Sequence, residues 1–154
     1  MVGTGKAAEN GILIKSAESL ELAHSINAIV LDKTGTITVG KPQVNDIFVF
    51  NKMKEGELLK IVGAIESKSE HPISKAILEK TKEVEVLEAQ NFEAIEGKGI
   101  KASINNNTYF AGNESLMKEN NIKLSESEGI YQKLYEQAKT VIFVSDYEKL
   151  LGII

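Results

Sequence analysis

The pattern of apolar positions changes character near Pro42, and this change divides the chain into two parts. In the first part, residues 26–31 are almost all apolar and rich in β-branched side chains, and the run ends at Asp32. Such a run is typical of a strand buried on both faces of a parallel sheet. The first part is too short to hold a core of its own. Residues 1–38 are therefore predicted to be the incomplete opening of an α/β domain.

Beyond residue 38, short apolar strands alternate with amphipathic helices. Residues 55–67 place Leu58, Ile61, Val62 and Ile65 at helical spacing, and residues 125–138 place Ala138 and two other apolar residues on an inward face. Further helices are predicted at 72–81 and 115–119. Strands are predicted at 44–50, 92–96, 100–104, 108–111, 141–144 and 150–154. This order predicts an α+β fold for residues 39–154, in which helical hairpins flank an antiparallel β-sheet.

Composition narrows the possible functions. The chain has 154 residues, 18 basic side chains that are all lysine, 22 acidic side chains, a net charge of −4 and no cysteine. The missing cysteines exclude disulfides and thiolate metal sites, and no metal site is predicted. Acidic charge without arginine argues against a nucleic-acid partner. The apolar runs are too short to cross a membrane, so a soluble, monomeric piece is expected.

The first candidate for chemistry is Asp32-Lys33-Thr34-Gly35-Thr36, at the end of the predicted buried strand. In open α/β sheets, reactive groups lie just beyond the carboxyl ends of the strands. A carboxylate nucleophile at that place can hold a phosphoryl group as an acyl phosphate, and a glycine nearby lets the backbone approach an anion. The alternative, an ordinary turn that contains an aspartate, is common but does not account for five such residues in succession.

This pentapeptide, with Ile37 and Thr38 after it, resembles the phosphorylation signature of the P-type ion-pumping ATPases. The resemblance implies that Asp32 accepts the γ-phosphate of ATP. It also implies that Thr34 contacts the phosphate and that Lys33 lies near it as a supporting charge. Asp32, Lys33 and Thr34 are the predicted catalytic residues.

The second candidate is Ser69-Glu70-His71-Pro72, with Glu66 five residues before the histidine. Pro72 suits the first turn of a helix. An imidazole can stack on adenine or bind its edge, and a carboxylate can accept the adenine amino proton. The pattern resembles the signature of the heavy-metal subclass of these pumps. The resemblance implies that Glu66 and His71 contact adenine, whereas His24 is interpreted as a surface residue.

The third candidate is Gly97-Lys98-Gly99-Ile100. By itself, a Gly-x-Gly is more often a tight turn between strands than a binding site. It resembles a Gly-x-Gly of the same pumps, where bare backbone lets the nucleotide lie close, and Gly112-Asn113 resembles a pair that lines the same pocket. Lys98 could meet the phosphates or be a solvated lysine. The predicted nucleotide-binding residues are Glu66, His71, Gly97, Gly99, Ile100, Gly112 and Asn113.

The resemblance covers nearly the whole chain. Residues 1–15 look like the segment that leaves the metal-binding membrane helix of copper pumps, and residues 151–154 look like the return to the phosphorylation domain. Residues 1–38 would then open a haloacid dehalogenase-like phosphorylation domain, and residues 39–154 would form the nucleotide-binding domain. The resemblance implies a piece of the cytoplasmic region of a copper(I)-exporting pump, with zinc or cadmium as the alternative cargo.

The same resemblance implies the partners and cofactors. ATP or ADP would bind, and the remaining phosphorylation, actuator and membrane domains of a parent pump would be the protein partners. The acidic loop that holds Mg²⁺ in this family does not occur in the chain, so most Mg²⁺ ligands would lie outside it. The chain by itself is expected to bind nucleotide with little or no hydrolysis, because phosphoryl transfer depends on metal clamping and positioning.

Two other functions remain possible from the sequence. One is a stand-alone nucleotide-sensing or protein-docking module without transport or catalysis. The other is a small phosphatase of the same aspartate-nucleophile superfamily, which would need a second aspartate two residues after Asp32. Thr34 occupies that position and favours a lasting phosphoenzyme.

Overall fold

The computed structural model describes residues 2–32 and 35–154, so the predicted catalytic residues Lys33 and Thr34 lie outside the described residues. The chain divides into two compact units, and the division falls between Gly40 and Lys41. Each unit is described by itself below.

The first unit contains two short helices, α1 (Val2–Glu9) and α2 (Ala17–Ala23). Ser16 caps α2, because its Oγ accepts a hydrogen bond from the Ser19 N–H at 3.2 Å. Neither helix contains a buried residue. The described part of this unit therefore has helical segments without a hydrophobic core.

The predicted buried strand at 26–32 is wrong for this chain. Residues 26–32 form no strand, and the side chains of Ile29 and Val30 are 76% and 98% exposed. A strand exists only through hydrogen bonds to a neighbour, and an apolar strand needs a layer on each face. The described part of the first unit supplies neither, so the apolar run stays extended and uncovered.

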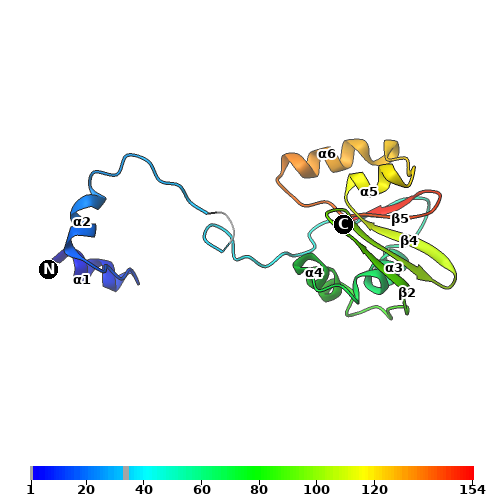
Figure 1. The fold of residues 1–154 in the computed structure, drawn as a ribbon, viewed down its shortest axis with the longest axis horizontal. Helices are drawn as coiled ribbons and strands as arrows, with labels where there is room; N and C mark the ends of the chain where they lie inside the picture. The colour runs from blue at the N-terminus through cyan, green and yellow to red at the C-terminus, as the bar shows by residue number, and fades with distance from the viewer. Residues whose placement is uncertain (1, 33–34) are drawn as a thin grey trace. The chain divides into compact units, whose positions relative to one another are not determined.

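The second unit is built on one six-stranded sheet in the order β1-β6-β5-β4-β3-β2, in which every neighbouring pair is antiparallel (Figure 1). The strands are β1 (Phe48–Val49), β2 (Gln90–Ile95), β3 (Gly99–Ile104), β4 (Asn107–Gly112), β5 (Phe143–Asp146) and β6 (Leu150–Ile153). The helices are α3 (Glu55–Glu66), α4 (Pro72–Lys80), α5 (Glu114–Glu119), a 3₁₀ turn η1 (Ser125–Ser127) and α6 (Glu128–Glu136). The predicted antiparallel α+β fold is confirmed.

Two details of the sheet follow from local chemistry. The turn between β3 and β4 uses Asn105 and Asn106 at φ values of 50° and 65°, a left-handed backbone that asparagine tolerates better than most residues. β1 is shorter than the strand predicted at 44–50, since it pairs with the edge of β6 for only two residues.

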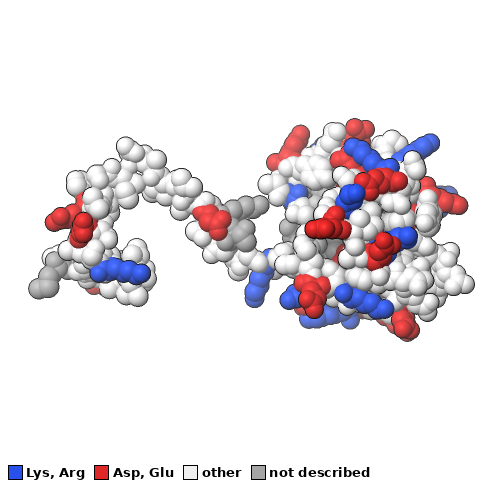
Figure 2. All heavy atoms as spheres, viewed as in Figure 1, with Lys and Arg blue, Asp and Glu red and all other residues white. Residues whose placement is uncertain are grey.

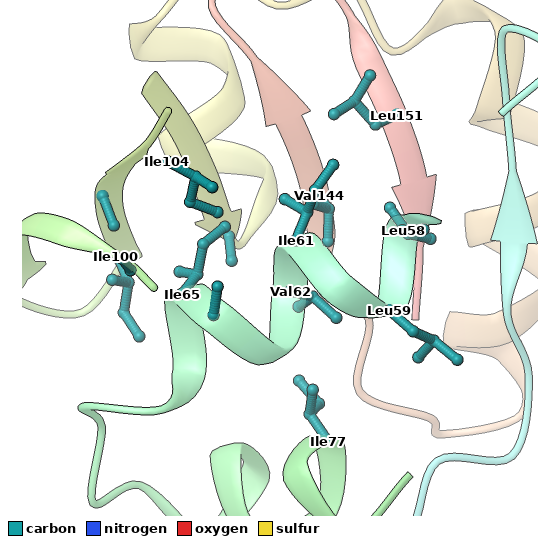
Figure 3. Close-up of a cluster of buried hydrophobic side chains, with 14 residues drawn as sticks. Leu58, Leu59, Ile61, Val62, Ile65, Ile77, Ile100, Ile104, Val144 and Leu151 are labelled. Atoms are coloured by element: carbon teal, nitrogen blue, oxygen red, sulfur yellow. The ribbon is translucent and has the colours of Figure 1, made fainter. Parts of the chain in front are cut away.

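One face of the sheet is covered by α3 and α4. Leu58, Ile61, Val62 and Ile65 of α3 are all buried, as their helical spacing predicts. Figure 3 shows these side chains in one apolar cluster with those of the strands, and Val62 lies on the side of α3 that faces Ile77 of α4. The strand residues of this cluster include Ile100, Ala102, Ile104, Ala111, Val144 and Leu151.

The opposite face is covered by α5 and α6. Tyr131 of α6 meets Phe143 of β5 edge to face, with ring centroids 5.3 Å apart. Ala138 does not face inward as predicted, because α6 ends at Glu136 and Ala138 is exposed at a φ of 55°. Tyr131 takes the buried position instead. The sheet is thus enclosed between two helical layers (Figure 1).

Charged side chains lie on the outside of these layers. Figure 2 shows lysines and acidic residues interspersed over the visible face of the second unit. This face offers no continuous basic track for a nucleic-acid backbone.

The difference between the two units can be measured. Ile65→Ala removes a fully buried side chain, so it should lower the free energy of unfolding by about 3 kcal/mol in urea titrations. Val30→Ala is the matched control, since its side chain is 98% exposed and should change that free energy by less than about 0.5 kcal/mol. Equal losses would show that the run at 26–31 belongs to a cooperative core.

Candidate functional site

A pocket of about 430 Å³ lies in the second unit, where the α3–α4 junction meets the turn between β2 and β3 and the start of α5. All seven predicted nucleotide-binding residues line it. The other lining residues are Ser69, Ile73, Ser74, Ala94, Ile95, Lys98, Ala111, Thr140, Val141 and Ile142. The fold therefore brings together residues from sequence positions 66 to 142.

Glu66 is the carboxylate of this pocket. It is the last residue of α3, and only 5% of it is exposed. Its Oε2 accepts a hydrogen bond of 2.6 Å from the Ser74 hydroxyl. Burial raises the pKa of the Glu66 carboxyl above its ordinary value, while the Ser74 hydrogen bond and the nearby His71 oppose that rise.

His71 is placed by the start of α4. It is the N-cap residue, and its Nδ1 accepts a hydrogen bond of 3.2 Å from the Ile73 N–H. Pro72 occupies the first turn, where its missing N–H leaves no hydrogen bond unmade. Because Nδ1 is an acceptor here, the neutral ring carries its proton on Nε2. The exposed imidazole can therefore donate from Nε2.

Gly99 and Gly112 face each other across β3 and β4. A Cβ on Gly99 would lie 2.2 Å from the carbonyl oxygen of Ala111, and a Cβ on Gly112 would lie 2.2 Å from that of Lys98. The close approach of the two strands alone requires both glycines. Gly97 has open space beside it, so a side chain would fit there. Its φ of +68° is a left-handed backbone conformation that favours glycine.

Asn113 ties the glycine turn to α5. Its Oδ1 accepts from the Leu116 N–H at 3.1 Å and caps the helix, and its Nδ2 donates to the Gly97 carbonyl at 2.8 Å. Its backbone N–H donates to the Lys98 carbonyl at 2.8 Å. These contacts hold the turn against the sheet. Asn113 thereby shapes the wall of the pocket.

Lys98 forms an ion pair at the edge of the pocket, and its contact with the phosphates of a bound nucleotide stays a prediction. Its Nζ donates to both carboxylate oxygens of Glu119 at 2.7 and 2.9 Å. The pair is partly exposed and is therefore a weak contributor to stability. The ion pair offsets the positive charge of Lys98 at the edge of the pocket.

Ser69 and Ser74 are pocket residues that the sequence reasoning missed. The available signal was spacing, because Ser74 follows His71 by three residues and so lies on the same side of α4. Val141, for which the sequence predicts only a strand, also lines the pocket. Lys139 does have a structural contact, an ion pair with Asp46.

The predicted catalytic residue Asp32 belongs to the first unit, where it is exposed and outside any strand. Within residues 2–32 and 35–154, no three acidic or histidine side chains group as metal ligands would. In the same residues, no helix has both the length and the apolar character that a bilayer crossing requires.

The glycine contact gives a direct test of how the pocket is built. Gly99→Ala combines a steric collision with a φ of +145°, so it should lower the free energy of unfolding by roughly 2–4 kcal/mol. Gly129→Ala in α6 meets nothing within 4 Å and should leave stability within about 1 kcal/mol of the parent, on the stabilising side. Chemical denaturation measures both variants, and a Gly99→Ala protein as stable as the parent would refute the close strand approach.

Comparisons with known proteins agree on the family. The model of the haloacid dehalogenase-like hydrolases matches residues 26–154. The copper-exporting P-type ATPase of Staphylococcus saprophyticus is 40% identical over 156 residues, which cover 100% of this chain and 19% of the relative. The copper-transporting ATPase HMA4 of Oryza sativa subsp. japonica is 40% identical over 99% of this chain and 17% of its own length.

A solved structure gives the same result. A zinc-transporting PIB-type ATPase in the E2.Pi state matches with a TM-score of 0.79 and 31% identity over 98% of this chain and 24% of that chain. The chain thus spans about a fifth of the length of the curated relatives that it matches. It belongs to the haloacid dehalogenase-like hydrolase family, and the proteins that it resembles over its whole length are P-type metal-transporting ATPases.

Proposed function

We propose that the second unit binds ATP or ADP by the adenine base in the pocket described above. The observation that carries this proposal is the buried Glu66 carboxylate beside the exposed His71 imidazole in a pocket whose other walls are largely apolar. Adenine has two flat apolar faces, one exocyclic amino donor and ring nitrogens that accept. The pocket offers a partner for each of these features.

The division of labour within the pocket follows from its chemistry. Glu66 accepts from the exocyclic amino group, and His71 stacks on the base or donates from Nε2 to a ring nitrogen. Ile100, which is 7% exposed, belongs to the apolar wall against the base. The turn from Gly97 to Gly99 lets the nucleotide approach bare backbone.

The wider function rests on the relatives. Asp32 is proposed to attack the γ-phosphorus of the bound ATP within a parent pump, which forms an aspartyl phosphate and releases ADP. The cargo is proposed to be copper(I), because the curated relatives at 40% identity are copper transporters, whereas the zinc-transporting structure is 31% identical. Zinc or cadmium is the alternative. No step of this proposal uses a Mg²⁺ ligand from the described residues.

The uncovered run at 26–31 supports the proposed protein partners. An extended apolar segment without a neighbouring strand is completed by further strands and helices. The remaining phosphorylation domain of a parent pump would supply them, and the actuator and membrane domains would complete the transporter. The chain would then belong to the cytoplasmic side of an integral membrane protein.

Isothermal titration of the chain with ATP tests the pocket. Glu66→Ala should weaken binding roughly ten- to hundredfold, because it removes a hydrogen bond to a charged group. His71→Ala should weaken it about tenfold. His24→Ala is the matched control, since His24 lies exposed in the first unit, and it should leave the affinity unchanged. An ATP affinity that neither pocket substitution changes would contradict the assignment of this pocket as the adenine site.

A further inference from the structure

The two carboxylate oxygens of Glu66 have different surroundings. Oε2 accepts from the Ser74 hydroxyl, whereas no protein donor reaches Oε1 in the described residues. Among the described residues, Ser145 Oγ is the only side-chain polar atom that is both fully buried and without a hydrogen-bond partner. Oε1 of Glu66 also lacks a partner, so it is not fully buried and part of its surface is accessible. One oxygen of the carboxylate is therefore engaged and the other is available to a ligand.

Ser74 is held firmly in this arrangement. It is 1% exposed, and its Oγ also lies 2.7 Å from the Ser69 Oγ. A serine hydroxyl has one proton, and an ionised carboxylate can only accept. Ser74 therefore donates to Glu66 and accepts from Ser69, whose oxygen in turn accepts from the His71 backbone N–H at 3.3 Å. This chain of hydrogen bonds sets the direction of the Ser74 proton.

Other charged groups leave this arrangement undisturbed. His71 is the titratable side chain that acts electrostatically on Glu66. Lys98 lines the same pocket but is paired with Glu119. Of the elements packed against α3, α4 carries exposed charged side chains, β1 and β4 carry none, and the lysine of β3, Lys101, pairs with an exposed glutamate.

The number of free carboxylate oxygens matters for the choice of base. Guanine presents two adjacent donors, its N1–H and its amino group, and a carboxylate with two free oxygens can accept both. Adenine presents its amino group next to a ring acceptor, so it needs a single carboxylate oxygen. Each carboxylate oxygen can accept more than one hydrogen bond, so a guanine edge would have to share Oε2 with Ser74, whereas the adenine amino group needs only Oε1. The arrangement thus favours adenine over the two-donor edge of guanine.

We propose that Ser74 is a positioning residue that contributes to base specificity, because its hydrogen bond takes up acceptor capacity of Oε2 of Glu66 and leaves Oε1 as the free oxygen for the ligand. This inference rests on the proposed function of the pocket. It assigns to the Ser74 hydroxyl, acting through Glu66, a part in the selection of adenine nucleotides over guanine nucleotides.

The arrangement has a consequence for pH dependence. Burial raises the pKa of Glu66, and the Ser74 hydrogen bond is the larger of the two influences that lower it. The ionised carboxylate is the stronger acceptor for the adenine amino group, so ATP binding weakens as the pH falls through this pKa. Removal of the Ser74 hydroxyl should move that weakening to higher pH.

Calorimetric titration of the full chain with ATP and with GTP tests the inference. Ser74→Ala should weaken ATP binding roughly three- to tenfold, the size of one net hydrogen bond, and should leave GTP binding equal or stronger. The pH at which ATP affinity has fallen halfway should move to a higher value. In a Glu66→Gln background, Ser74→Ala should have a smaller effect on ATP affinity, because the glutamine amide oxygen is a weaker acceptor than the carboxylate through which Ser74 acts. Ser67→Ala is the matched control, since the Ser67 hydroxyl donates to the Ala64 carbonyl and does not line the pocket.

Each other outcome overturns the inference in a distinguishable way. If the chain without substitutions binds no ATP, both the proposed function and this inference are overturned. Glu66-dependent ATP binding that Ser74→Ala leaves unchanged overturns the inference alone. Equal weakening of ATP and GTP, or the same weakening in the Glu66→Gln background, would show that Ser74 acts only on the fold, and thermal melting of each variant identifies a folding defect.

Discussion

The close approach of β3 and β4 at Gly99 and Gly112 is the constraint on which the pocket depends. Neither position has room for a Cβ. A Cβ on Gly99 would lie 2.2 Å from the Ala111 carbonyl oxygen of β4, and a Cβ on Gly112 would lie 2.2 Å from the carbonyl oxygen of Lys98, the residue just before β3. The approach lets the Asn113 N–H reach the Lys98 carbonyl, and Asn113 then caps α5 and holds Gly97. One strand contact thus sets the β2–β3 turn, the start of α5 and one wall of the pocket together.

The opposite wall depends on the packing of α3. The helix lies against the sheet through buried side chains as far as Ile65, the residue immediately before Glu66. Hydrophobic burial of the helix therefore carries the carboxylate out of water, which raises its pKa and makes its hydrogen bonds more consequential. The junction that follows then turns back through His71 into α4, whose Ser74 meets the same carboxylate. Along this short segment, the residues that pack in the core are thus followed directly by residues that line the pocket.

Sequence reasoning succeeded where local rules decide the outcome. The helical spacing around Ile65, the proline-started helix and the glycine turn depend on nearby residues, and the structure contains each of them. The strand predicted before Asp32 failed because a strand needs partners, and the described residues contain none for it. Ala138 failed because α6 ends earlier than its apolar period suggested.

Contacts between distant residues were the other limit. The need for glycine at positions 99 and 112 arises from the close approach of two chain segments that are distant in the sequence. The ion pair between Lys98 and Glu119 likewise joins residues that are distant in the sequence. Ser74 was overlooked because serine is common on helices, and only its distance of 2.6 Å to Glu66 shows its importance. The pocket residues themselves were named from a family resemblance, and the fold brings all seven of them to one cavity.

Nucleotide binding by the second unit in this pocket, without help from other domains, can be tested by backbone amide shifts of the ¹⁵N-labelled chain, recorded as ATP is added. The amides of Gly97, Gly99, Ile73 and Asn113 should shift together and saturably, while that of Gly129 in α6 should stay in place. Saturable shifts confined to residues outside the pocket, with the Gly97 and Gly99 amides unmoved, would contradict it.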